Sequence, residues 1–264
     1  MPKSIKPKTN LEIEGALASL PDPYRAGLPA KDSVVGITLP TAGAGYMIIH
    51  TNEIDAYETG EPKAGSRAAK QVAASTGDDY SGSSRRAAKL SISAAKTETF
   101  KDVKDLIQTL PAESLMVAHK PPIGTGPTSS RVQEEQRNVH VSAFLYAASK
   151  EADNDFHLIV GRDLKAVPEL YMTMELSGLP PSNSPSFARL KGARDAFKKF
   201  FADHAGGKLP GLTYDFYQPP IPVQIDGSLF FDLTHASGQR PGPPSLKSRM
   251  PVVWEIHPIT AFVA

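Results

Sequence analysis

Cysteine is absent from this chain of 264 residues. Its absence excludes disulfide bonds, thiolate metal ligands and thiol nucleophiles, because each of these needs a sulfur atom from cysteine. Any metal chemistry must therefore use histidine, aspartate and glutamate. A chain without cysteine is also compatible with a reducing compartment, and this favours a cytoplasmic location.

Long hydrophobic runs are absent as well. No stretch approaches the roughly 18 uninterrupted apolar residues that a membrane-spanning helix needs. The basic N-terminal sequence MPKSIKPKTNLEIEG is not followed by the apolar segment of a signal peptide. The sequence therefore predicts a cytoplasmic protein that does not enter a membrane.

Net charge is small, because 29 lysines and arginines face 28 aspartates and glutamates. No overall field would draw the whole molecule onto nucleic acid, so any such binding must come from a local patch. The length of 264 residues is enough for one large domain or two modest ones, and the hydrophobic content of 40% is ordinary for a soluble globular protein. The 24 prolines and 20 glycines predict many turns.

The N-terminal half divides into three regions by composition. Residues 1–56 form a polar arm followed by two short apolar runs, 34–39 and 46–50, which the glycine-rich PTAGAG would join as a β-hairpin. Residues 57–98 are rich in Ala, Ser and Gly and predict a flexible linker or insertion, because they offer little apolar surface to bury. Residues 99–137 predict a short helix and a proline-rich loop.

Residues 138–264 carry the strongest periodic signals. Three runs alternate as strands do (NVHVSAFLYAA, DFHLIVGR and LYMTMEL), an amphipathic helix follows in SPSFARLKGARDAFKKFFADH, and two further strands are VQIDGSLFFDL and VVWEIHPITAFVA. Three strands, a helix and two strands is the order of an OB-fold, a five-stranded β-barrel with a helix between its third and fourth strands. We therefore predict a mainly β protein with an OB-like barrel over 138–264.

Ionisable side chains interrupt the apolar pattern of these strands at three places. They are Asp153, Asp155 and His157 at the second strand, Asp232 and His235 after the fourth, and Glu255 and His257 in the fifth. Residues two apart in a strand share one face. In an OB-fold the loops after the first and fourth strands flank the usual ligand surface, so these side chains are expected to converge there.

The chemistry of this set has two interpretations. Imidazole and carboxylate are the ligands that remain for a divalent ion when thiolate is absent, so Asp155, His157, His235 and His257 are candidate ligands for zinc, manganese or magnesium. An ion there could activate water for attack on a phosphodiester, with Glu255 as a candidate base. Alternatively, each imidazole pairs with a nearby carboxylate and only satisfies the rim of the barrel.

The loop GQRPGPPSLKSR supplies three basic residues, Arg240, Lys247 and Arg249. They are candidate contacts for the phosphates of a nucleotide or nucleic acid. The alternative is an ordinary solvated loop, since flexible basic loops are common on protein surfaces.

Four stretches resemble a group of poorly characterised bacterial proteins: KEADNDFHLIVGRD, YMTMEL, GSLFFDLTHASGQRPGP and WEIHPIT. The shared patterns are K-E-x-D-x-D-[FY]-H-L, F-F-D-x-x-H-x-x-G and [WI]-E-[ILV]-H-P-[IV], and the resemblance covers residues 137–263. It implies an OB-like barrel and no particular activity. It adds Glu175, at the strand-ending glutamate of that pattern, as a second candidate base. Many relatives look secreted and contain cysteine, and this chain departs from both features.

Three hypotheses for the function remain open from the sequence. The first is a ligand-binding module whose polar rim recognises a sugar, a nucleotide or an oligonucleotide. The second is a metal-dependent hydrolase of the nuclease or phosphodiesterase type. The third is an assembly or scaffold protein that forms oligomers through the N-terminal arm.

Overall fold

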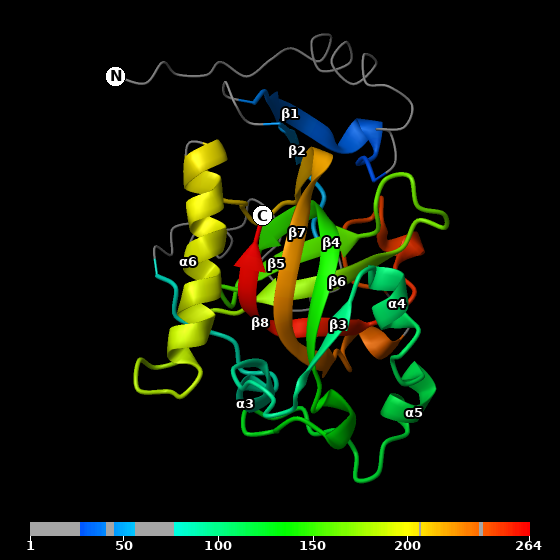
Figure 1. Ribbon diagram of the computed structural model, residues 1–264, viewed down its shortest axis with the longest axis vertical. Helices are drawn as coiled ribbons and strands as arrows, with labels where there is room; N and C mark the ends of the chain where they lie inside the picture. Colours follow the sequence, from blue (N-terminus) through cyan, green and yellow to red (C-terminus); the bar gives the residue numbers. More distant parts are fainter. Residues whose placement is uncertain (1–26, 41–44, 56–76, 206, 238–239) are drawn as a thin grey trace.

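The computed structural model describes residues 27–40, 45–55, 77–205, 207–237 and 240–264. Over these residues the protein is a strand-rich mixed α/β structure with one eight-stranded sheet and one long helix (Figure 1). The strands are β1 (Val34–Thr38), β2 (Met47–Thr51), β3 (Thr97–Phe100), β4 (Asn138–Lys150), β5 (Phe156–Gly161), β6 (Tyr171–Leu176), β7 (Asp215–Phe231) and β8 (Trp254–Val263). The α-helices are α3 (Arg86–Lys89), α4 (Val103–Ile107), α5 (Glu113–Val117) and α6 (Phe187–His204).

Five of the strands form a partial ring. The sheet has the order β1-β2-β7-β8-β6-β5-β4-β3, and β7 also pairs with β4, so β4, β5, β6, β8 and β7 follow one another around a circle. The circle is weakest between β6 and β8, which run parallel and share a single register pair, Met174 with Ile256. The predicted barrel is thus confirmed in part: all five strands exist in the predicted order with α6 between the third and fourth, but the sheet is not a fully closed barrel.

The larger hydrophobic core lies on one face of the ring strands and under α6, and a second cluster joins Ile159 of β5 to Ile37 and Ile49 of the first two strands. Alternate residues of β5 and β6, such as Leu158 and Met174, are fully buried in the larger core. Helix α6 lies along one side of the ring (Figure 1) and brings Phe197 to 5.0 Å from Phe156, measured between ring centroids. Gly227 marks a close crossing, because a Cβ atom there would lie 2.5 Å from the carbonyl oxygen of Pro258.

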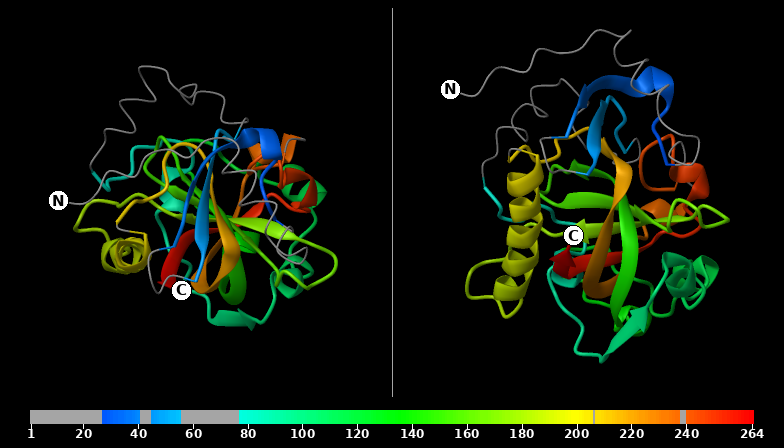
Figure 2. Two further views of the ribbon diagram at one scale, coloured as in Figure 1. Left: turned by 90° about the horizontal axis from the view of Figure 1, so that it is seen from above. Right: turned by 45° about the horizontal axis from the view of Figure 1, so that its top comes forward.

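The predicted N-terminal hairpin is confirmed. Strands β1 and β2 pair antiparallel, and β2 continues the sheet by pairing with the first residues of β7. The hairpin lies at one end of the ring, at the top of Figure 1 and of the right-hand view in Figure 2. Strand β7 begins at Asp215, earlier than the sequence indicates, because its first half pairs with β2 and its second half with β8.

The linker predicted over 57–98 differs from the structure in its second half. Residues 56–76 lie outside the described residues, whereas 77–98 contain α3 and the first residues of β3. Composition missed this because the segment is held by buried polar side chains in place of apolar ones: Arg85 is 2% exposed, and its guanidinium pairs with Glu135. The helix predicted after residue 99 is α4, and Asp102 caps it by accepting a hydrogen bond from the amide of Lys104.

Candidate functional site

The face of the ring strands opposite Leu158 and Met174 carries the ionisable residues of three strands. His157 on β5 lies directly across from Glu175 on β6 in the strand register. Glu255 and His257 alternate with the core residues Trp254 and Ile256 on β8. Strand side chains alternate between the two faces of a sheet, so the register of these strands places His157, Glu175, Glu255 and His257 on the same face. The predicted convergence of polar side chains is therefore found.

The first group consists of Asp155, Glu175 and His257. The Nδ1 atom of His257 lies 2.5 Å from a carboxylate oxygen of Glu175, and its Nε2 atom lies 3.4 Å from Oδ2 of Asp155. The second oxygen of Asp155 accepts a hydrogen bond from the amide of Gly178 at 2.5 Å. The side chains of Asp155 and His257 have no exposed surface. Such a group can bind a cation or exchange protons.

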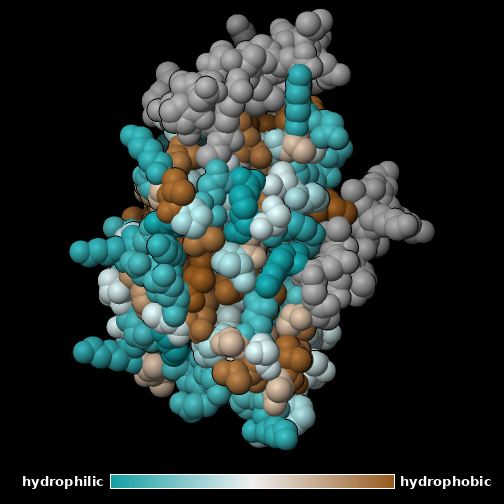
Figure 3. Space-filling view, turned by 90° about the vertical axis from the view of Figure 1, so that its right-hand side faces the viewer, coloured by the Kyte–Doolittle hydropathy of each residue, from teal (hydrophilic) through white to brown (hydrophobic). Residues whose placement is uncertain are grey.

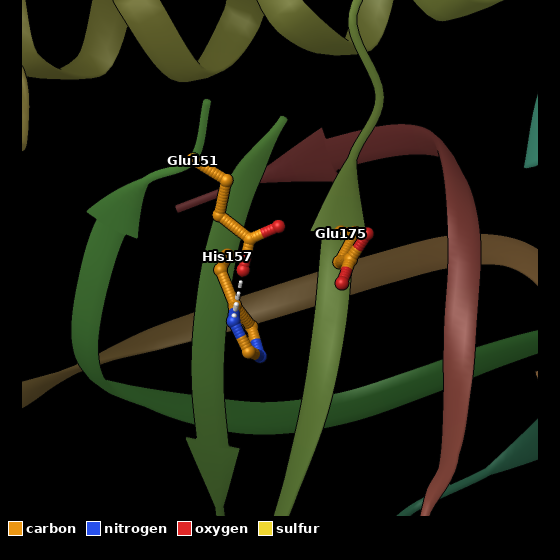
Figure 4. A group of neighbouring side chains, drawn as sticks. All are labelled: Glu151, His157 and Glu175. Atoms are coloured by element: carbon orange, nitrogen blue, oxygen red, sulfur yellow. Dashed lines mark ion pairs between the residues drawn. The ribbon is translucent and has the colours of Figure 1, made fainter. Parts of the chain in front are cut away.

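The second group consists of Glu151, His157 and Glu175 (Figure 4). The Nδ1 atom of His157 lies 2.6 Å from a carboxylate oxygen of Glu151 and 3.2 Å from the hydroxyl of Tyr214. Glu175 stands on the neighbouring strand, and one potential ligand atom from each of the three residues lies within 4.8 Å of the others. Glu175 therefore belongs to the first and the second groups and links their two imidazoles.

The third group consists of Asp232, His235 and Glu255. Nδ1 of His235 pairs with a carboxylate oxygen of Asp232, and Nε2 of the same ring lies 3.8 Å from a carboxylate oxygen of Asp55. Glu255 accepts a hydrogen bond from the hydroxyl of Thr173 at 3.3 Å and lies 3.8 Å from His257. The three groups are thus continuous through Glu175 and Glu255.

Burial and charge shift the pKa values of this network strongly. Burial, reinforced by Asp153, raises the pKa of Asp155 well above its usual value, and burial together with Glu175 does the same for Glu255. Burial opposes the charge of His235, but hydrogen bonds to Asp232 and Asp55 outweigh it and raise its pKa to about 11. These shifts favour the neutral forms of Asp155 and Glu255 and the charged form of His235.

Lys89 supplies the cation closest to the first group. Its ammonium lies 3.8 Å from Asp153, 3.8 Å from Glu175 and 4.0 Å from Asp155. Burial raises the pKa of Glu175, but His257 and Lys89 outweigh it and hold that pKa well below its usual value. One lysine thus faces three carboxylates.

A pocket of about 320 Å³ opens next to the network. Its lining combines two aromatic rings, several hydroxyl groups and charged groups of both signs. The lining residues are Tyr80, Gly82, Ser83, Ser84, Arg85, Lys89, Thr125, Asp153, Phe230, Asp232, Leu233, Thr234 and His235. Lys89 and Asp153 join the pocket to the first group, and Asp232 and His235 join it to the third.

The structure brings together eight of the predicted site residues and leaves three outside. The eight are Asp153, Asp155, His157, Glu175, Asp232, His235, Glu255 and His257. Arg240 pairs with Glu113, and Arg249 pairs with Glu169. Together with Lys247, these basic residues do not line the pocket. On the face that carries α4 and α5, apolar surface forms narrow bands between polar side chains (Figure 3).

Sequence reasoning missed several residues of the site. Lys89, Arg85 and Tyr80 come from the segment interpreted as a linker, and Asp55 and Glu151 come from the ends of other elements. One signal could have found two of them. Arg85 and Lys89 are four residues apart within SRRAAK, the spacing that places two side chains on one face of a helix.

In comparisons with known proteins, no family model, no curated protein and no solved structure matched this chain. The resemblance to the bacterial group therefore stays a prediction that rests on the quoted motifs. Among the described residues, no helix is both long enough and apolar enough to cross a membrane.

Proposed function

We propose that this protein binds a small polar ligand, a sugar or a nucleotide, in the pocket beside the buried network, and that residues 138–264 form an OB-like barrel. Two features support the barrel: the strand order around the ring and the position of α6. In OB-folds the outer face of the second and third strands, which correspond to β5 and β6, is a common ligand surface.

The composition of the pocket carries this proposal. Tyr80 and Phe230 offer ring faces, on which a sugar or a base can stack. Ser83, Ser84 and Thr125 offer hydroxyl groups for hydrogen bonds. A volume of about 320 Å³ fits a small molecule, since ligand pockets usually span about 300–1,000 Å³.

Replacement of Asp153 by asparagine is expected to weaken binding about tenfold or more, because it removes a charged hydrogen-bond acceptor from the pocket wall. The measurement is calorimetric titration of the full chain with glucose, N-acetylglucosamine, AMP and a short oligothymidylate. Asp195→Asn is the matched control, since Asp195 is an exposed helix residue outside the pocket. The proposal is wrong if none of these probes binds, or if both variants bind as the unmodified chain does.

A second candidate function is metal-dependent hydrolysis. The observation that favours it is the position of the third group, because Asp232 and His235 lie on the pocket wall with Glu255 behind them. Catalytic metal sites typically combine three protein ligands with one open position for water or substrate. When bound, such an ion supplies a water molecule of lowered pKa.

Hydrolysis of bis(p-nitrophenyl) phosphate in the presence of zinc, manganese or magnesium tests this candidate. Asp232→Asn is expected to lower the rate on the order of 100-fold, and a chelator should abolish it. Asp226→Asn is the control, because Asp226 pairs with His140 in a similar but more exposed contact. A rate that the chelator and Asp232→Asn leave unchanged would rule the candidate out.

The third hypothesis, assembly through the N-terminal arm, stays a prediction. Residues 1–26 of that arm lie outside the described residues.

A further inference from the structure

We propose that Asp155 and His257, with Glu175 beside them, bind a divalent transition-metal ion of the zinc type behind the pocket. The ion would lie between Oδ2 of Asp155 and Nε2 of His257. This site is separate from the pocket wall and does not depend on which ligand the pocket takes.

The position of the proton on the His257 ring decides which nitrogen can bind an ion. A carboxylate can only accept hydrogen bonds, so the contact of 2.5 Å between Glu175 and Nδ1 favours the tautomer with the ring proton on that nitrogen. In the neutral ring, Nε2 then presents a lone pair toward Oδ2 of Asp155. A carboxylate that holds one histidine nitrogen while the other binds the ion is the usual arrangement of metal-binding histidines.

A cation between them would satisfy two buried acceptors that face each other. Among the described residues, neither Oδ2 of Asp155 nor Nε2 of His257 has a hydrogen-bond partner, and both side chains are fully buried. Unsatisfied groups of this kind are rare in protein interiors, because each forfeits its hydration and gains nothing in return. An ion in this position would satisfy both atoms at once.

The separation of the two atoms fits a tetrahedral ion. Ligands that are each about 2.0–2.1 Å from zinc lie about 3.3–3.4 Å apart at a tetrahedral centre. The measured separation between Nε2 of His257 and Oδ2 of Asp155 is 3.4 Å. One potential ligand atom of each of Asp155, Glu175 and His257 lies within 4.8 Å of the others.

The balance of charge at this group also supports a divalent ion. When ionised, the carboxylates of Asp153, Asp155 and Glu175 carry three negative charges, and Lys89 contributes one positive charge. The remaining two negative charges match one divalent ion. Lys89 stays 3.8 Å or more from each of these carboxylate oxygens, beyond hydrogen-bond distance, and so does not occupy Oδ2 of Asp155.

The His235 ring differs in this respect. Asp232 holds its Nδ1 atom, and Asp55 lies near its Nε2 atom, so both nitrogens already face a carboxylate. A proton on each nitrogen satisfies that arrangement. The first group is therefore the stronger candidate for a resident ion.

Zinc titration of the full chain after chelator treatment tests the proposal. We expect one tightly bound zinc per chain and a raised melting temperature, because an ion that binds only the folded state stabilises it. Asp155→Asn should weaken this zinc binding on the order of 100-fold. His140→Gln, at the partly exposed His140–Asp226 pair, should leave it unchanged.

Two results would overturn the proposal: an unmodified chain that binds no zinc and keeps its melting temperature, or equal losses for Asp155→Asn and His140→Gln. If Asp155→Asn does not fold, X-ray absorption of the zinc-loaded unmodified chain decides. We expect one imidazole among the zinc ligands, with nitrogen and oxygen at about 2.0–2.1 Å. Two or more imidazoles would contradict this ligand set. Ligand binding in the pocket is measured without zinc, so the two proposals can fail separately.

Discussion

Arg85→Met is expected to lower the free energy of unfolding by about 3–5 kcal/mol, the usual cost of leaving a buried charge without its partner. Both terminal nitrogens of Arg85 bond to Glu135, at 2.8 and 2.7 Å. The Glu135 side chain has no exposed surface and also accepts a hydrogen bond from the amide of Phe231. In the variant, the Glu135 carboxylate would remain buried without a positively charged partner. Urea unfolding followed by circular dichroism measures the loss.

Arg137→Met provides the matched control. Arg137 also forms two hydrogen bonds to one carboxylate, that of Glu98 at 2.7 Å, but the two side chains are 21% and 44% exposed. Exposed ion pairs contribute about 0–1 kcal/mol, so this variant should unfold almost as the unmodified chain does. Equal losses for the two arginine variants would contradict the interpretation. The double variant Arg85→Met, Glu135→Leu should recover much of the stability, because it removes both charges.

The ring strands could be predicted from the sequence because the residues of their core face alternate with residues of other types. In β5, Phe156, Leu158 and Val160 join the core, and that alternation is visible in DFHLIVGR. The start of β7 could not be predicted, because TYDFYQPPIP contains three prolines that usually mark loops. The pairing of this stretch with β2 depends on residues far away in the chain.

The candidate site was predictable to the extent that it follows strand periodicity. Asp155 and His157 are two residues apart, as are Glu255 and His257, so each pair had to share a face. The contact between His257 and Asp155 joins residues about a hundred positions apart, and it was expected only through the barrel order.

The cation of the site was not predictable in the same way. Lys89 lies in a segment whose composition resembles a flexible linker, and composition scales count apolar burial alone. The segment is fixed by ion pairs that form only when the ring strands are assembled. The spacing of Arg85 and Lys89 indicates only that the two side chains share a helix face, and does not indicate that this face is buried.

Lys89→Met is expected to cost about 3–5 kcal/mol of unfolding free energy at neutral pH, because it removes the only lysine that the described residues place within 4 Å of Asp153, Asp155 and Glu175. Burial opposes the charge of Lys89, but Glu175 and the two aspartates raise its pKa well above the usual value. A raised lysine pKa stabilises the fold at every pH below the unfolded pKa of about 10.4 and stops doing so only above the folded pKa. The loss should therefore be fully present at pH 7.

Acid should shrink the difference between this variant and the unmodified chain. Glu175 has a lowered pKa in the fold, so its contribution is present above the unfolded pKa of about 4.3 and is lost as pH falls through the folded pKa. Without Lys89 that pKa rises, the carboxylates take up protons earlier, and the missing cation matters less. Urea unfolding at pH 7 and pH 4.5 measures both losses.

Lys198→Met is the control for this effect. Lys198 pairs with Asp78 at a site where both side chains are 31% exposed, and Asp78 keeps Arg194 as a second partner. Its loss should cost about 0–1 kcal/mol and should not produce the same decrease between pH 7 and pH 4.5. If Lys89→Met costs no more than Lys198→Met, or costs the same at both pH values, then Lys89 does not compensate the buried carboxylates. The divalent ion proposed behind the pocket would then lose its support from charge balance, which counts Lys89 as the one cation already in place.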